Sequence, residues 1–253
     1  MKPKQVLLPR SLLLSFLLLL SCCAELPQGE RAGAGDAGDP LEPMNRRVYD
    51  NNYFLDRLLV RPLAELYRAT VPPGLRDRLS GILSNMKEPV VFANDVLQGD
   101  FDKAGITAER FGINTTIGVG GMWDFANEWD LPQQTGDFGQ TLASWGVDEG
   151  PYLFLPFFGP SNFRDALGFG IDFAMSPWQY VAYFQGGPES LIQYEAAYIG
   201  TDSLLRREKY IETVDALRAG SLDPYAKVRS AYRQHRRAQL GVAQKEDLSK
   251  IGN

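Results

Sequence analysis

The chain has 253 residues, enough for one large domain or two small ones. Its formal net charge is −5, which argues against a nucleic-acid partner, because such partners call for a basic face. The same acidic balance excludes attachment to a membrane through a polybasic patch. The two cysteines, Cys22 and Cys23, are neighbours, so the remaining sequence holds no disulfide framework, thiol enzyme or cysteine-ligated metal site.

Residues 1–21 are predicted to be a lipoprotein signal peptide. Basic residues precede an apolar stretch at 11–20, which is too short to span a bilayer. Leu19-Leu20-Ser21-Cys22 is similar to a lipobox, in which the cysteine becomes acylated. We expect acylation at Cys22, with Cys23 as the alternative, and a permanent anchor because two or more acyl chains hold a protein stably.

The residue after Cys22 is a cysteine, not the aspartate that keeps enterobacterial lipoproteins in the inner membrane. By analogy we expect a lipid anchor in the outer membrane, on its periplasmic side. Residues 22–38, beyond the cysteines, are mainly Gly, Ala, Asp and Pro and are predicted to form a flexible tether. Residues 241–253 are predicted to be a polar C-terminal tail.

Residues 39–240 are predicted to form a single, mostly helical domain. Helical periodicity predicts a helix over 41–59, a second that starts at Pro62, and a third along the apolar stripe of residues 75–86. A proline is then expected to open a further segment over 89–99.

A helix over 101–116 follows, and the final helix is predicted to start at Asp223-Pro224, where Asp is the N-cap and Pro occupies the first helical position. Strand signals are weak and limited to residues 152–155, too short to build a sheet alone. These elements predict an all-α fold.

Three stretches without charged residues interrupt this charged sequence at 111–123, 150–163 and 173–188. None is a credible membrane span, since Gly, Pro and polar residues interrupt each one. They are either the core of a large domain or a surface that meets lipid, where Trp and Tyr favour the headgroup boundary.

Catalytic chemistry is scarce in the sequence. His235 is the sole histidine and is flanked by arginines, which would make it a poor base. Gly118-Val119-Gly120-Gly121 has helical flanks instead of the strand and βαβ unit that a dinucleotide fingerprint needs, and a tight turn is the more plausible role. We therefore expect no enzyme, no cofactor and no metal, although two carboxylates could in principle hydrolyse glycan.

The chain resembles the MlaA/VacJ lipoproteins. The resemblance starts at Asp39-Pro40-Leu41-Glu42 and covers nearly the whole mature sequence. Further matching motifs, in order, are Asn45-Arg46, Val60-Arg61-Pro62, Glu88-Pro89, Leu97-Gln98-Gly99, Arg110-Phe111, Asn114-Thr115, Gly118-Val119-Gly120-Gly121, Phe138-Gly139-Gln140-Thr141-Leu142, Gly150-Pro151-Tyr152, Leu155-Pro156-Phe157-Phe158-Gly159, Arg164-Asp165, Asp202-Ser203-Leu204 and Asp223-Pro224-Tyr225.

This resemblance implies a ring-shaped helical domain with a central amphipathic channel. It implies a protein that removes mislocalised phospholipid from the outer leaflet and passes it to a soluble periplasmic carrier, so that the lipid asymmetry of the outer membrane is maintained. A trimeric porin is a further candidate partner. The sequence departs from the better-known members at 159–186 and in about the last twenty residues. The resemblance therefore implies least about porin contacts and the C-terminal partner surface.

Candidate residues follow from the resemblance together with the uncharged stretches. We assign seven to the channel or to lipid contact: Ile113, Ile117, Val119, Met122, Tyr152, Leu153 and Phe157. Gly118, Gly120 and Gly121 are assigned to a hinge or tight turn that shapes the channel. The alternatives are a structural or porin-associated lipoprotein that carries no lipid, and a periplasmic hydrolase that uses two carboxylates.

Overall fold

A computed structural model describes residues 39–241. The predicted signal peptide, the acylation site at Cys22 or Cys23, the tether up to residue 38 and nearly all of the C-terminal tail lie outside this range. The elements are α2 (Glu42–Leu55), the π-helix η1 (Asp56–Val60), α3 (Arg61–Thr70), α4 (Pro73–Leu97), α5 (Phe101–Thr116), α6 (Phe125–Glu128), α7 (Phe138–Ser144), β1 (Tyr152–Leu155), β2 (Gly159–Asn162), α8 (Phe163–Met175), α9 (Pro177–Lys209), α10 (Ile211–Ala219) and α11 (Pro224–Gln239).

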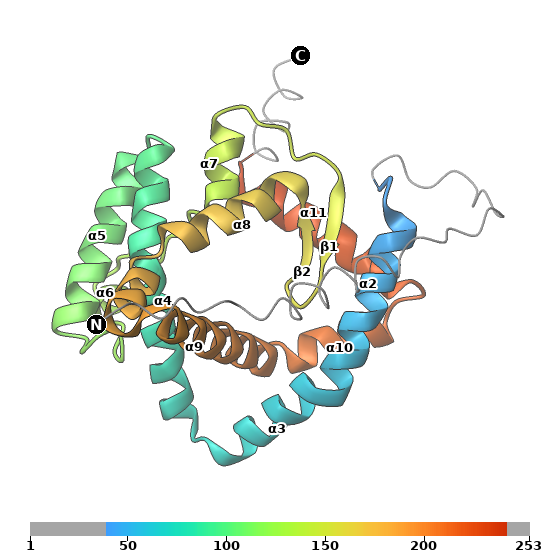
Figure 1. The fold of residues 1–253 in the computed structure, drawn as a ribbon, viewed down its shortest axis with the longest axis horizontal. Helices are drawn as coiled ribbons and strands as arrows, with labels where there is room; N and C mark the ends of the chain where they lie inside the picture. The colour runs from blue at the N-terminus through green and yellow to red at the C-terminus, as the bar shows by residue number, and fades with distance from the viewer. Residues whose placement is uncertain (1–38, 242–253) are drawn as a thin grey trace, which may run out of the picture. The chain divides into compact units, whose positions relative to one another are not determined.

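The described elements form a closed circle of contacts. Going round it, α2 packs on β1, the hairpin packs on α8, α8 on α7, α7 on α4, α4 on α9, and α9 on α3, which continues back through η1 to α2. Figure 1 shows the same order around a central space, with α8 above it and α9 below it in that view. The all-α prediction is confirmed, with one two-stranded hairpin as its β component.

Several predicted elements are found where the sequence places them. The helix over 101–116 coincides with α5, and α11 starts at Pro224 with the Asp223 side chain accepting a hydrogen bond from the Ala226 amide at 3.1 Å. The predicted strand at 152–155 is β1, which pairs antiparallel with β2. Local signals for caps and periodicity therefore locate these elements correctly.

The prediction at Pro89 is wrong, because α4 runs through this residue without a break. A proline inside a helix removes one backbone hydrogen bond and costs about 3 kcal/mol. Packing of α4 along α5, α7 and α9 supplies the stabilisation that this loss requires. The helix ends at Leu97 and the chain turns at Gly99, which has a φ of 76°.

Polar side chains fill much of the interior of the described domain. Asn45 of α2 lies fully buried, where its Nδ2 donates to the Tyr152 carbonyl at 3.0 Å and its Oδ1 accepts from the Phe154 amide at 2.8 Å. Arg110 is also buried and donates to both carboxylate oxygens of Asp124, at 3.1 Å each. These satisfied polar groups fix helix against hairpin and α5 against the loop that follows it.

The described part of the chain has no helix with the length and apolar character needed to cross a membrane.

Candidate functional site

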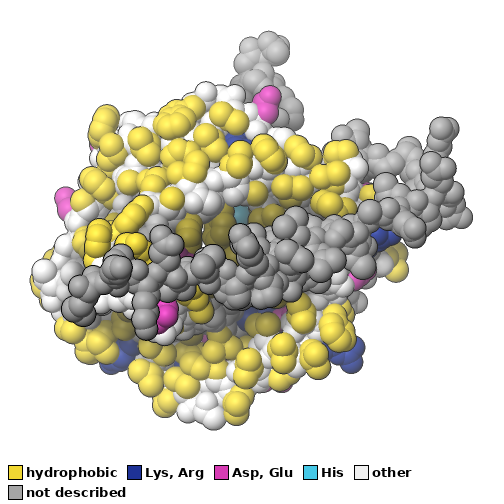
Figure 2. All heavy atoms as spheres, in the orientation of Figure 1, with side chains coloured by type: hydrophobic (Ala, Val, Ile, Leu, Met, Phe, Trp, Pro, Cys, Tyr) yellow, Lys and Arg dark blue, Asp and Glu magenta, His cyan; other side chains and the backbone are white. Residues whose placement is uncertain are grey.

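The circle of elements encloses a cavity of about 910 Å³. Helices α2, η1, α4, α8, α9 and α10 line it together with the hairpin. Aromatic and aliphatic side chains make up much of its wall, among them Tyr49, Tyr53, Phe154, Phe158, Phe169, Phe173, Tyr194, Tyr198, Ile199 and Leu217. Figure 2 shows hydrophobic side chains gathered around a central hollow on this face of the molecule.

Helix α9 gives the cavity a polar strip. Tyr194, Tyr198, Asp202 and Arg206 recur every four residues and so share one helix face, which lines the cavity. The Asp202 carboxylate accepts from Arg206 Nε and from Lys87 Nζ of α4, each at 2.7 Å. Burial lowers the pKa of Lys87, although Asp202 acts in the opposite direction.

A second charged group enters the wall from α8. Asp172 Oδ1 accepts a hydrogen bond from Asn94 Nδ2 at 2.7 Å, and the carboxylate also accepts from the Phe138 amide at 3.0 and 3.1 Å. Burial raises the pKa of Asp172 to about 6, against the lowering effect of these hydrogen bonds. This group therefore changes its charge near pH 6.

Charges of both signs are matched along the cavity wall. The basic groups are Lys87, Arg206, Arg207 and Arg218, and the acidic groups are Asp56, Asp172, Glu195 and Asp202. Burial raises the pKa of Glu195 as well. The cavity thus combines an apolar wall with strips of balanced charge, which makes it amphipathic.

The helices that line the cavity turn apolar side chains outward. On α2 and η1 the inner face carries Tyr49, Asn52, Tyr53 and Asp56. The exposed large apolar side chains of α2, η1 and α3 that do not line the cavity are Met44, Phe54, Leu58, Leu59, Leu63 and Leu66. Helices α8 and α9 expose Leu167, Ile171, Val181, Tyr183, Phe184 and Ile192. Apolar exposure on this scale is typical of a surface that meets lipid or another protein.

The described residues contain no group of three or more His, Cys, Asp or Glu side chains that could hold a metal ion. His235 lies exposed on α11.

The family follows from comparison of the sequence. A family model described as MlaA lipoprotein matches residues 37–239, most of the chain. The chain belongs to the MlaA lipoprotein family.

Characterised MlaA relatives and a solved structure are similar over most of their length. The protein named intermembrane phospholipid transport system lipoprotein MlaA of Haemophilus influenzae is 36% identical over 241 residues, which is 93% of this chain and 90% of that protein. The Escherichia coli K12 protein of the same name is 36% identical over 78% of this chain and 76% of its own. A solved structure reported under "Structural basis for maintenance of bacterial outer membrane lipid asymmetry" is 33% identical, with a TM-score of 0.68 over 80% of this chain and 99% of that one.

One of the seven residues assigned to the channel or to lipid contact lies in the cavity wall. Phe157, in the turn of the hairpin, is 80% exposed and sits at the edge of the cavity. Tyr152 is instead buried in an aromatic cluster with Phe154 and Tyr225, against which Tyr49 packs. Leu153 is half-buried on the opposite face of β1.

The other four of these residues lie in and after the last turn of α5. Ile113 and Met122 are half-buried, whereas Ile117 and Val119 are exposed. They do not line the cavity. Lipid contact by these residues therefore stays a prediction about the outer surface.

The glycine motif of this MlaA chain forms a tight turn against α4. Gly120 and Gly121 have φ values of 71° and 94°, in the left-handed region that favours glycine. A Cβ atom on Gly121 would lie 2.5 Å from Asn85 Cβ, and one on Gly118 would lie 2.3 Å from the Trp123 carbonyl oxygen. Whether the turn also moves as a hinge stays a prediction.

Most of the cavity lining was not assigned from the sequence. Tyr194, Tyr198, Asp202 and Arg206 carry a detectable signal, since their spacing of four puts two aromatic and two charged side chains on one face of a helix. Arg207 and Arg218 carry no such signal, because their approach to η1 and α2 depends on how distant helices pack.

Proposed function

We propose that this member of the MlaA family carries phospholipid through its central cavity. It would take phospholipid misplaced in the outer leaflet of the outer membrane and pass it to a soluble carrier in the periplasm, which preserves the lipid asymmetry of the membrane. The names of the Haemophilus and Escherichia relatives, which place them in an intermembrane phospholipid transport system, support this proposal.

The observation that carries the proposal is the direction in which the helices point their side chains: charged groups face the cavity and large apolar groups face outward. A charged headgroup that leaves water for an apolar medium loses its hydration at a cost of several kcal/mol or more, unless polar groups replace the water. The matched charges on α9 and α4 supply such groups inside the cavity, and its aromatic wall suits the acyl chains of the cargo. The exposed leucines of η1 and α3 suit the surrounding membrane. Transport in this form breaks no covalent bond, so it requires no catalytic residue.

The anchor and the apolar surface would act together to place the cavity. Acylation at Cys22 would hold the chain at the outer membrane, on its periplasmic side. The exposed apolar side chains of η1, α3, α8 and α9 would then sink into the inner leaflet and fix the depth of the cavity. A trimeric porin is a further proposed partner, supported by the resemblance to the family.

Deletion of the gene tests the transport role. We expect more phospholipid in the outer leaflet, measured by surface labelling or by an outer-leaflet acyltransferase, and greater sensitivity to detergent. Unchanged outer-leaflet phospholipid and intact detergent resistance would contradict transport. Complementation with the intact gene, beside a Cys22→Ala variant, separates loss of the protein from loss of its anchor.

Purified protein separates transport from the alternatives. A carrier should retain phospholipid, detected by mass spectrometry of the detergent-purified protein, without hydrolysing it. A scaffold would contain none, and a hydrolase would release lysophospholipid or glycan fragments.

A further inference from the structure

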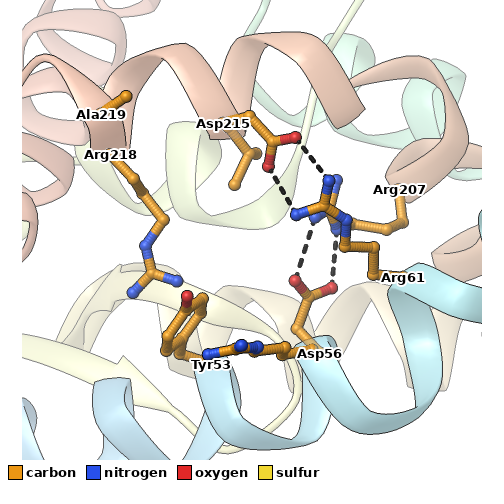
Figure 3. Close-up of a pocket in the computed structure, with 9 residues that line it drawn as sticks. Tyr53, Asp56, Arg61, Arg207, Asp215, Arg218 and Ala219 are labelled. Atoms are coloured by element: carbon orange, nitrogen blue, oxygen red, sulfur yellow. Dashed lines mark hydrogen bonds and ion pairs between the residues drawn. The ribbon is translucent and has the colours of Figure 1, made fainter.

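A smaller pocket of about 260 Å³, rich in arginine, adjoins the central cavity (Figure 3). Arg57, Arg61, Arg207 and Arg218 line it together with Asp56 and Asp215. Tyr53, Arg207 and Arg218 also line the central cavity, so the two spaces share a wall.

Two of the arginines are engaged in paired contacts with aspartates. Arg61 of α3 donates to both carboxylate oxygens of Asp215 in α10, at 2.9 and 3.2 Å. Arg207 of α9 donates to both carboxylate oxygens of Asp56 in η1, at 2.6 and 3.0 Å. Figure 3 shows the two guanidinium groups next to each other between these aspartates. Both acidic side chains of the pocket are therefore already paired with an arginine.

Donors remain after these pairs are formed. Nη1 of Arg207 is buried and has no hydrogen-bond partner within the described residues, in a side chain that is 10% exposed. Arg57 and Arg218 have no carboxylate partner in the same range. The residues that line the pocket carry four positive charges against two negative ones, and Glu65 beside the pocket accepts from Arg61 Nε at 3.0 Å. A buried guanidinium nitrogen without a partner is costly, which favours a bound acceptor.

Arg218 is held in a fixed position. Its guanidinium lies over the Tyr53 ring, 3.0 Å from the centroid, and its Nη2 donates to Tyr49 Oη at 2.7 Å. Figure 3 shows Arg218 and Tyr53 facing each other on the side of the pocket opposite Asp215. Aromatic contacts of this kind position a guanidinium without neutralising it.

We propose that this arginine pocket binds the phosphodiester of a phospholipid whose acyl chains lie along the central cavity. A phosphodiester carries one negative charge and accepts several hydrogen bonds, and the planar guanidinium presents its donors in a matching geometry. The shared wall lets one molecule occupy both spaces. This assignment rests on the proposed function, and it names the chemical group of the lipid that the protein recognises.

The test compares two lipids with the same acyl chains, phosphatidylglycerol and diacylglycerol, on the mature lipoprotein in detergent. The measured quantity is the ratio of their dissociation constants. We expect a preference of about tenfold or more for phosphatidylglycerol, as charge-assisted hydrogen bonds imply. Arg218→Gln should lower this ratio several-fold, whereas Arg218→Lys, which keeps the charge but not the planar donors, should give an intermediate ratio. Arg237→Gln, on an exposed arginine of α11, is the matched control and should keep the full ratio.

Each other outcome has a distinct meaning. Equal binding of both lipids by the unmodified protein would overturn the pocket assignment and leave lipid transport standing. Binding of neither lipid would overturn both. Stabilisation by inorganic phosphate alone that is lost in Arg218→Gln, without a lipid preference, would identify a site for free phosphate and overturn the assignment to a headgroup. An unchanged ratio in Arg218→Gln would place recognition outside this pocket and overturn the assignment.

Discussion

Asp172 is the residue at which pH should act on the domain. Its pKa of about 6 in the folded protein lies above its ordinary value of 3.8, because the carboxyl is buried in the cavity wall. The folded state therefore binds the proton more tightly, so the contribution of this group to the free energy of unfolding is largest below about pH 4. That contribution is lost as the pH rises through 6.

Asp172→Asn should remove this dependence. A shift of about two pKa units corresponds to roughly 2–3 kcal/mol, so the stability of the original protein should rise relative to the variant by up to that amount between pH 7 and pH 4. Urea unfolding of both proteins across this range measures the difference. Parallel stability curves would show that the carboxyl titrates normally.

Arg110 is the residue whose loss should destabilise the domain most directly. It is 2% exposed and donates to Asp124, to the Leu131 carbonyl and, at 3.4 Å, to Glu88. Lysine keeps the charge but cannot reach these acceptors together, so Arg110→Lys should lower the free energy of unfolding by about 3 kcal/mol. Arg237→Lys, at an exposed position, should change it by less than about 0.5 kcal/mol in the same urea experiment.

At the scale of elements, the turn after α5 offers a matched pair of glycines. Gly121→Ala places a Cβ 2.5 Å from Asn85 Cβ in α4, at a φ of 94°, and should cost about 3 kcal/mol through overpacking and backbone strain. Gly120→Ala meets nothing within 4 Å and should cost about 1 kcal/mol from its φ of 71° alone. Equal unfolding free energies for the two variants would show that the turn does not pack tightly on α4.

The elements also show what the sequence could predict. Helix α5 and the start of α11 were predicted correctly, because their apolar spacing and caps act within a few residues. The predicted segment start at Pro89 was wrong because the contacts that keep α4 intact come from α5, α7 and α9, and local propensity does not contain them. Tyr152 was assigned to the channel from its uncharged neighbourhood, but the alternation of β1 turns it into the aromatic cluster.

At the scale of the whole described domain, the exposed apolar surface should bind lipid without the acyl anchor. A Cys22→Ala/Cys23→Ala variant should still associate with phospholipid vesicles, since η1 and α3 expose Leu58, Leu59 and Leu63. Adding Leu63→Glu should weaken this association about tenfold, as expected from the loss of one buried leucine. Flotation of vesicles measures it, with Leu222→Glu in the loop before α11 as the control. Equal flotation of both variants would contradict insertion through α3.

The paired contacts Arg61–Asp215 and Arg207–Asp56 join segments more than 150 residues apart in the chain, next to the point where α3 meets α9. Together they tie η1 to α9 and α3 to α10. Ions screen the more exposed Arg61–Asp215 pair far more than the more buried Arg207–Asp56 pair or the packing of α4 on α5. Rising ionic strength should therefore loosen α3 from α10 while the rest of the circle keeps its contacts.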